Sequence, residues 1–177
     1  MATEVLEPTF EITSAWLIWM LPFAAALIMP GIGKLSKKST GYVAVGFALM
    51  SAVSAASLIP LALEAGEVHS QIMWIEALGI KAGVLADPLS IIMANVVGWI
   101  SFLIMIYSTG YMKGDKDITR FWFWMMFFIG SMQLIVLSDN LLQVFFGWEG
   151  VGLASYALIS FWYRDKKKDH VGVEGRT

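Results

Sequence analysis

The sequence contains no cysteine, and charged residues make up only 15% of its 177 positions, against 58% hydrophobic residues. The absence of cysteine excludes disulfides, iron–sulfur clusters and cysteine nucleophiles within the chain. Soluble domains are on average about 25% charged and about 45–50% apolar, so this composition cannot supply a polar surface for a soluble fold. A soluble globule, a nucleic-acid-binding domain and a disordered segment are therefore excluded, and the lipid bilayer is the expected solvent.

Histidine is also scarce, since the chain has only His69 and His170, and both lie in polar stretches. A haem held by two histidines inside the membrane would need both of them at membrane depth. We therefore expect no redox cofactor and no metal in this chain, so any electron transfer takes place in partner chains.

Five apolar stretches have the length of a membrane-spanning helix, which needs about 20 residues to cross about 30 Å of hydrocarbon. These stretches are 15–32, 40–63, 88–112, 121–137 and 141–163. We predict an all-α integral membrane protein with five transmembrane helices in a single membrane domain.

The basic residues fall in alternate connections between these stretches. Eleven of the twelve lie in the first and third connections or in the tail, namely Lys34, Lys37, Lys38, Lys113, Lys116, Arg120, Arg164, Lys166, Lys167, Lys168 and Arg176. Cytoplasmic loops of membrane proteins carry an excess of Lys and Arg. We therefore predict a multi-pass protein of the cell membrane, with the N-terminus outside and the residues after Tyr163 in the cytoplasm.

The connections on the other side have their own local signals. The longest one, 64–87, contains the β-prone runs 72–76 and 82–85, which predict a short β-hairpin. Asp87 precedes a proline, as an N-cap residue at a helix start does, and Asp139 lies in the three-residue turn before the last apolar stretch. A capping role is the prediction for both acids.

Glu149 is the one ionisable residue in the interior of the five stretches. It lies eight residues after Leu141, which places it about 12 Å below the membrane boundary in an α-helix. A charged residue at the centre of a spanning helix costs about 2.5–3.5 kcal/mol on insertion scales, so such a residue usually serves a function. The position suits a proton relay. The alternative is a structural hydrogen bond to a neighbouring helix.

The residues around Glu149 indicate a close helix contact and a polar path. Gly150 and Ala154 form a small-xxx-small pair. Helical spacing places Tyr156 and Ser160 on the face of Glu149, where they are candidate proton-transfer residues. Asn95, Ser131 and Gln133 are further polar residues at membrane depth, with helix–helix hydrogen bonds as their simplest role.

A single carboxylate does not make a pump, because directional transfer needs a second titratable group that biases the first. No further acid, lysine or histidine lies at membrane depth in this sequence. The partner group is therefore expected on another chain, or in a part of the working unit that this chain lacks.

Several sequence blocks resemble a known family. They are 87–90 (DPLS), 107–112 (YSTGYM), Asp117 with 120–121 (RF), 138–140 (SDN) and 147–156 (GWEGVGLASY). Their order and spacing over about 85–163 are similar to the antiporter-like L subunit of complex I and its relatives. The lysine-rich extension and the tail 172–177 look closest to the membrane L subunit of archaeal F420H2 dehydrogenase.

This resemblance implies a proton-translocating subunit of a membrane arm, driven by electron transfer in partner subunits that hold flavin and iron–sulfur clusters. It implies that Glu149 is the family's key glutamate of the fifth helix. The family's chain continues through further helices, which carry a lysine partner for this glutamate. We therefore expect an N-terminal part of a longer subunit, without a redox centre of its own, whose surroundings are the bilayer and other membrane-arm subunits.

Two alternatives stay open. The first is the large subunit of an Mrp-type Na⁺/H⁺ antiporter, which shares the motif around Glu149. Co-purification with flavin or iron–sulfur subunits discriminates, because the antiporter has none. The second is a structural membrane module without transport, in which replacing Glu149 by glutamine is silent.

Overall fold

The computed structural model describes residues 10–162, and five long helices dominate it. They are α1 (Phe10–Leu35), α2 (Lys37–Ala56), α4 (Pro88–Tyr111), α5 (Ile118–Leu137) and α6 (Leu141–Ile159), and a short helix α3 (Ile59–Leu63) follows α2. Each long helix, with α3 counted as the continuation of α2, is long and apolar enough to cross a membrane. The predicted helical membrane fold with five spans is confirmed.

Most helix ends lie a few residues from the predicted bounds, as α1 and α6 illustrate. Helix α1 begins at Phe10 rather than Ala15, so a first turn with Glu11 precedes the apolar stretch. Helix α6 ends at Ile159 rather than Tyr163, which itself lies outside the described residues. Hydropathy reports where a segment is apolar, whereas the backbone continues or stops according to its terminal hydrogen bonds.

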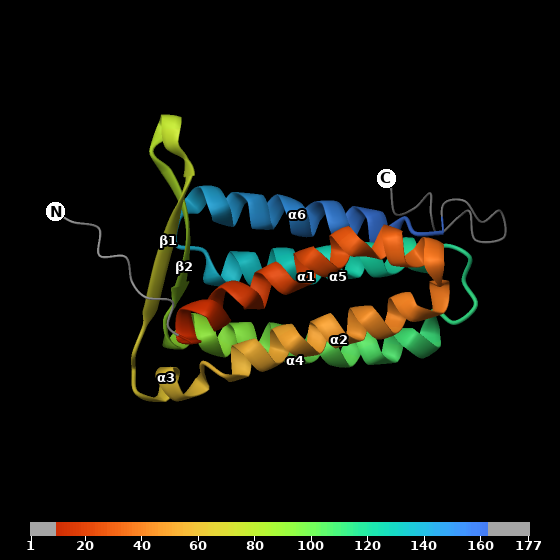
Figure 1. Cartoon of the computed structure of the whole chain (residues 1–177), viewed down its shortest axis with the longest axis horizontal. Coiled ribbons are helices and arrows are strands. Elements are labelled where there is room, and N and C mark those ends of the chain that lie inside the picture. The colour runs from red at the N-terminus through yellow and green to blue at the C-terminus, as the bar shows by residue number, and fades with distance from the viewer. Residues whose placement is uncertain (1–9, 163–177) are drawn as a thin grey trace.

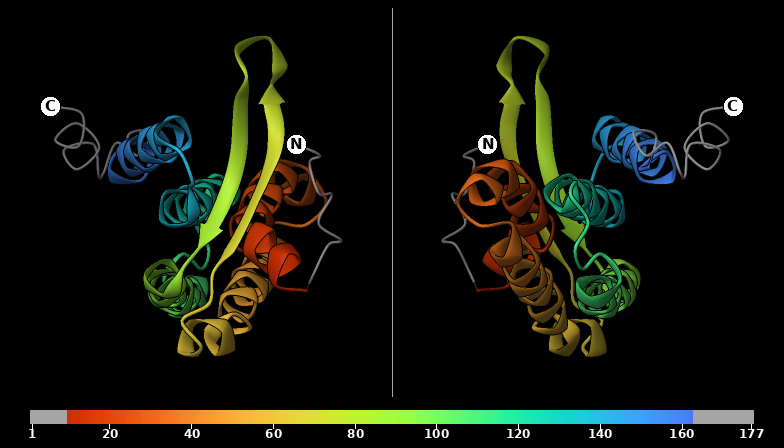
Figure 2. Two further views of the ribbon diagram at one scale, coloured as in Figure 1. Left: turned by 90° about the vertical axis from the view of Figure 1, so that its left-hand side faces the viewer. Right: turned by 90° about the vertical axis from the view of Figure 1, so that its right-hand side faces the viewer.

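The long helices run side by side, and α5 lies at the centre of the bundle (Figures 1 and 2). Helix α5 packs against α1, α2, α4 and α6, while the extensive helix contacts of α6 are with α5 alone. Small residues at the crossings let the helix backbones approach closely, as at Gly98, whose Cα faces Ala52 of α2. One broad face of α6 is therefore left uncovered.

A two-stranded antiparallel hairpin crosses one end of the bundle (Figure 1). Its strands are β1 (Val68–Ile75) and β2 (Ile80–Ala86), joined by a 3-10 turn and by Gly79 at a φ of 65°, which favours glycine. The predicted hairpin is confirmed, and both strands are longer than predicted. Its inner face packs on the helices through the fully buried Val84 and Ala86, and the Trp16 indole donates to Ser70 Oγ at 3.2 Å.

The described basic residues are segregated along the bundle axis. Lys81 lies in the hairpin, and the others are at the opposite end, where α1, α2, α4 and α5 meet their connections (Figure 1), namely Lys34, Lys37, Lys38, Lys113, Lys116 and Arg120. There the Lys37 ammonium donates to the Lys116 carbonyl at 2.9 Å. The fold thus has one basic end, while which membrane side this end faces stays a prediction.

Candidate functional site

Helix α6 begins with a side-chain cap from Asn140, whose Oδ1 accepts from the Gln143 backbone N–H at 2.9 Å. The prediction that Asp139 caps a helix is wrong, because its carboxylate turns away toward the hairpin. The corresponding prediction for Asp87 is confirmed, since its carboxylate accepts from the Ser90 N–H at 2.7 Å in a capping box at the start of α4.

The buried face of α6 is a stripe that packs on α5, formed by Gln143, Gly147, Gly150 and Ala154. A Cβ atom at Gly147 would lie 2.7 Å from Ile135 Cγ1 and 3.0 Å from the Ser131 carbonyl oxygen. A Cβ at Gly150 would collide with Ser131 Oγ. The glycines let the two backbones touch, so the expected close contact at Gly150 and Ala154 is the α5–α6 interface.

Glu149 lies on the other side of α6 and is exposed. It is the ninth of 19 helix residues, and no described residue makes a hydrogen bond or ion pair with its carboxylate. Its neighbours Trp148, Leu153 and Tyr156 are 68%, 52% and 52% exposed. In a bilayer this face would expose one carboxyl group to lipid among apolar side chains. Another helix or subunit must therefore cover it.

The structure separates the predicted path residues. Tyr156 shares the exposed face with Glu149, as the helical spacing predicts. Ser160 is buried instead, and its hydroxyl donates to the Tyr156 carbonyl at 2.7 Å. Ser160 is the C-cap of α6, and both its backbone N–H and its short side chain bond back to the Tyr156 carbonyl, so the hydroxyl lies against the last helical turn.

The other polar residues at membrane depth serve helix packing or bond within their own helix. Asn95 Nδ2 donates to the Ala55 carbonyl of α2 at 2.9 Å, and Gln133 Nε2 donates to the Ala94 carbonyl of α4 at 3.0 Å. The Ser131 hydroxyl bonds within its own helix. These contacts fit the structural role expected of such residues, and none of the contacts described here leads to Glu149.

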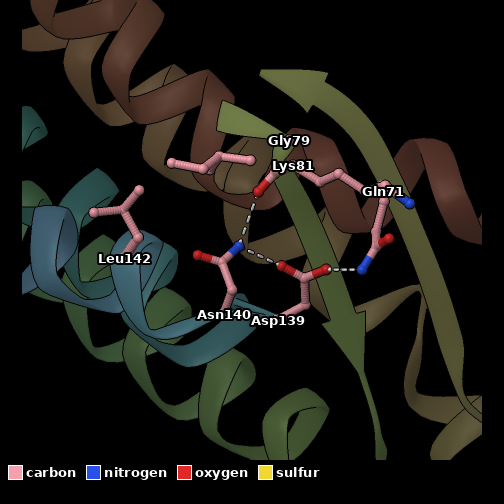
Figure 3. A pocket seen from close by; sticks show the side chains of 7 residues that line it. Gln71, Gly79, Lys81, Asp139, Asn140 and Leu142 are labelled. Atoms are coloured by element: carbon pink, nitrogen blue, oxygen red, sulfur yellow. Dashed lines mark hydrogen bonds between the residues drawn. The ribbon is translucent and has the colours of Figure 1, made fainter. Parts of the chain in front are cut away.

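A polar cluster at the hairpin end was missed by the sequence analysis (Figure 3). Asp139 Oδ2 lies 3.1 Å from His69 Nε2 and 2.6 Å from Gln71 Nε2, and Oδ1 accepts from Asn140 Nδ2 at 2.7 Å. Burial raises the pKa of Asp139, but the hydrogen bonds from Gln71, His69 and Asn140 outweigh it, and the net effect is a lowered pKa. The one available signal was the alternation of His69 and Gln71, which puts both on one strand face.

The same turn is fastened to β2 by further bonds. Asn140 Nδ2 donates to the Lys81 carbonyl at 3.1 Å, and the buried N–H of Gly83 donates to Gln143 Oε1 at 2.9 Å. Ser138 forms an isolated antiparallel bridge with Val84. The start of α6 is thus tied to the hairpin through both side chains and backbone.

Two cavities flank this junction. A polar one of about 370 Å³ is lined by residues that include Gln71, Lys81 and Asp139 (Figure 3). A largely apolar one of about 650 Å³ lies between α1, the hairpin, α5 and α6, where Trp16, Trp74 and Phe146 are among its lining residues. Within residues 10–162, no group of three or more His, Asp and Glu residues is placed to hold a metal ion.

Comparison with known proteins gives two adjacent family matches. The family described as NADH-ubiquinone oxidoreductase (complex I), chain 5 N-terminus, matches residues 73–122. The family described as NADH:quinone oxidoreductase/Mrp antiporter, TM, matches residues 138–174. The second match includes Glu149.

Relatives match nearly the whole chain. NADH-quinone oxidoreductase subunit L of Rickettsia bellii is 38% identical over 165 residues, which are 90% of this chain and 26% of the relative. The subunit L of Escherichia coli K12 is 36% identical over 140 residues, 76% of this chain and 23% of the relative. NADH-ubiquinone oxidoreductase chain 5 of Dictyostelium discoideum is 38% identical over 149 residues, 81% of this chain and 22% of the relative. The chain spans about a quarter of the length of these relatives.

Among solved structures, a chain of the Mrp complex from Dietzia sp. DQ12-45-1b shares the fold, with a TM-score of 0.68 and 23% sequence identity. The match covers 83% of this chain and 16% of the other. With the helical bundle, the two family matches and the relatives at 36–38% identity, the chain is an L-subunit-like membrane protein of the antiporter type.

Proposed function

We propose that this chain is part of a proton-translocating membrane subunit of a complex I-like dehydrogenase, in which Glu149 takes up and releases the transported proton. The observation that carries the proposal is the position of Glu149. It is the one acid in the interior of the described spanning helices, and it lies on the uncovered face of α6 with no partner among residues 10–162.

An uncovered carboxyl at this depth is costly in lipid, so the working assembly must cover it. A purely structural acid would face the helix it stabilises, as Asn95 and Gln133 do. Glu149 instead faces away from α5, toward a helix of the same subunit or of a neighbour. A lysine on that helix, which the resemblance implies, would favour the charged carboxylate, and its own loss of a proton would favour the neutral acid.

The proton route continues along the same face. Tyr156 lies seven residues after Glu149, about two helical turns toward the basic end of the bundle. Ser160 is buried away from this face, and its hydroxyl proton is held by the Tyr156 carbonyl, so in the proposed route it can only accept a hydrogen bond. Gly152 lies between Glu149 and Tyr156, and a Cβ atom built there has nothing within 4 Å, which leaves room for water or a covering side chain.

The assembly around the subunit is proposed in the same terms. The relatives are named as subunits of NADH-quinone oxidoreductase, so other membrane-arm subunits are the expected neighbours. Redox subunits with flavin and iron–sulfur clusters supply the electrons to a quinone-type acceptor, and F420H2 is the proposed alternative to NADH as electron donor. The basic end faces the cytoplasm, with the hairpin and the N-terminus outside.

An Mrp-type Na⁺/H⁺ antiporter subunit is the second candidate, and two observations favour it. The family that matches residues 138–174 includes Mrp antiporters, and the fold matches a chain of an Mrp complex. Isolation of the native assembly discriminates between the candidates. Flavin and iron–sulfur subunits in the purified complex support the dehydrogenase, and electrogenic Na⁺/H⁺ exchange without them supports the antiporter.

The test is Glu149→Gln in the complete assembly in proteoliposomes, with electron transfer and proton uptake measured in parallel. We expect proton translocation to be lost while electron transfer remains, because the amide cannot carry a proton. Glu149→Asp, which keeps the carboxyl, should retain part of the activity. Glu76→Gln, at an exposed acid of the hairpin turn, is the matched control. Unchanged pumping in Glu149→Gln rejects the proposal and favours a structural membrane module.

A further inference from the structure

The junction between the hairpin and α6 contains a titratable pair that the proposed proton route does not use. His69 and Gln71 of β1 and Gly83 of β2 meet Asp139 of the α5–α6 turn and Gln143 of the first turn of α6 (Figure 3 shows Gln71 and Asp139). We call these five residues the hairpin clasp. Asp139 bonds to β1 and Gln143 bonds to β2, so both strands of the hairpin are joined to the start of α6.

Gln143 couples the position of α6 to that of the hairpin. It belongs to the buried stripe of α6, and its Oε1 holds the Gly83 N–H at 2.9 Å. Glu149 lies six residues further along the same continuous helix, whose backbone hydrogen bonds make it rigid over that distance. The depth and rotation of Gln143 therefore set the depth and rotation of Glu149.

The Asp139 carboxylate determines when His69 Nε2 acts as a hydrogen-bond donor. The ionised Asp139 Oδ2 is an acceptor, so His69 Nε2 donates to it across 3.1 Å when that nitrogen carries a proton. Gln71 Nε2 lies 3.1 Å from the same nitrogen and can donate to it only when it is unprotonated. The imidazole side chain is 48% exposed, whereas the carboxylate is 3% exposed. The imidazole is therefore accessible from outside the protein, while the carboxylate is shielded beneath it.

Few other charged groups surround the pair. Asp139 remains ionised near neutral pH because its hydrogen bonds lower its pKa. Lys81, from β2, lines the same cavity. Gln71 and Asn140 are neutral, and α1 approaches the opposite hairpin face through Trp16. From α6 itself, the described titratable residues are Glu149 and Tyr156, both farther along the helix.

We propose that the hairpin clasp is a proton-sensitive positioning device, with Asp139 and Gln143 as positioning residues for Glu149 and His69 as the group that senses pH on the hairpin side. This inference rests on the proposed function of Glu149. Histidine changes charge between about pH 5 and pH 8, and its cationic form bonds a carboxylate more strongly. A low pH on the hairpin side therefore strengthens the bond between His69 and Asp139 and holds α6 in place. A high pH weakens this bond.

The conformational test uses spin labels, which need introduced cysteines because this chain has none. Met73→Cys on the hairpin and Leu141→Cys on α6 are both exposed positions, 56% and 86% in the native residues. In the complete subunit we expect the distribution of label distances to narrow between about pH 8 and about pH 5.5. His69→Gln and Asp139→Asn should abolish the narrowing, and Glu76→Gln should preserve it. A distribution that is independent of pH, or still responds in His69→Gln, overturns the proposal.

The functional test measures proton translocation against pH on the hairpin side in the assembled complex. His69→Gln should flatten the profile, whereas a purely structural role would lower activity equally at every pH. The two proposals fail separately. If Glu149→Gln still pumps while the label distance responds to pH, the proposed function of Glu149 is wrong, and the proposal that the clasp is a conformational switch is supported. If Glu149→Gln is inactive and the label distance does not respond to pH, the proposed role of the clasp is wrong.

Discussion

The carboxylate of Asp139 occupies the space that a side chain at Gly83 would need. A Cβ atom built on Gly83 would overlap both carboxylate oxygens of Asp139, while the Gly83 N–H is bonded to Gln143. The absence of a side chain at this strand position is thus what allows the α5–α6 turn to close over the hairpin.

Gly83→Ala should therefore expel the Asp139 carboxylate and weaken the contact between hairpin and helices. Overpacking of this kind typically costs about 1–3 kcal/mol. Thermal unfolding in detergent, followed by circular dichroism, measures the loss. The control is a double-mutant cycle with Asp139→Gly, in which the alanine should cost much less. Additive effects of the two substitutions would show that Asp139 and Gly83 do not compete for this space.

Gly147→Ala should destabilise the α5–α6 interface, because its Cβ would lie 3.0 Å from a backbone oxygen that cannot turn aside. We expect a loss of about 1–3 kcal/mol in unfolding free energy, measured by steric trapping in bicelles. Gly152→Ala in the same helix is the matched control, since a Cβ there has nothing within 4 Å. Equal stability of the two variants would contradict the packing described here.

Asp139→Asn should change the acid dependence of stability. The folded-state pKa of Asp139 lies below its ordinary value of 3.8, so its charge stabilises the fold above that value. This contribution is lost as the pH falls through the folded-state pKa. Between about pH 6 and about pH 3, the melting temperature of the native protein should therefore fall more than that of Asp139→Asn. Glu64→Gln, at an exposed acid, should keep the native slope. Parallel curves for all three proteins would refute the assignment.

Tyr156→Phe should slow proton translocation in the assembled complex while leaving its fold intact, because the tyrosine side chain is half exposed and loses only its hydroxyl. The loss should be smaller than that of Glu149→Gln, since water can bridge the gap. Tyr107→Phe on α4 is the matched control, with a 69% exposed ring that stacks on Tyr111. Proton flux in proteoliposomes is the measurement, and native flux in Tyr156→Phe would remove this residue from the route.

The helices and the hairpin were predictable because their signals are local. Runs of apolar residues with the length of a bilayer, β-prone runs between turn residues and a proline after Asp87 each act within one segment. Helical periodicity likewise predicted that Glu149 and Tyr156 share one face, but not that this face is exposed. The predicted position of Ser160 on this face differs from the structure, because its hydroxyl bonds back to the Tyr156 carbonyl and is buried at the end of α6.

The sequence by itself thus determined a membrane protein with five spans, one basic end and one acid at membrane depth, since solvation in lipid constrains each segment independently. Only the tertiary structure decided which way that acid faces, and which partner Asp139 binds. Both depend on contacts between segments distant in the chain: the glycine stripe of α6 turns Glu149 away from α5, and β1 brings His69, 70 residues away, to Asp139. Such contacts arise from packing in three dimensions, which no local pattern encodes.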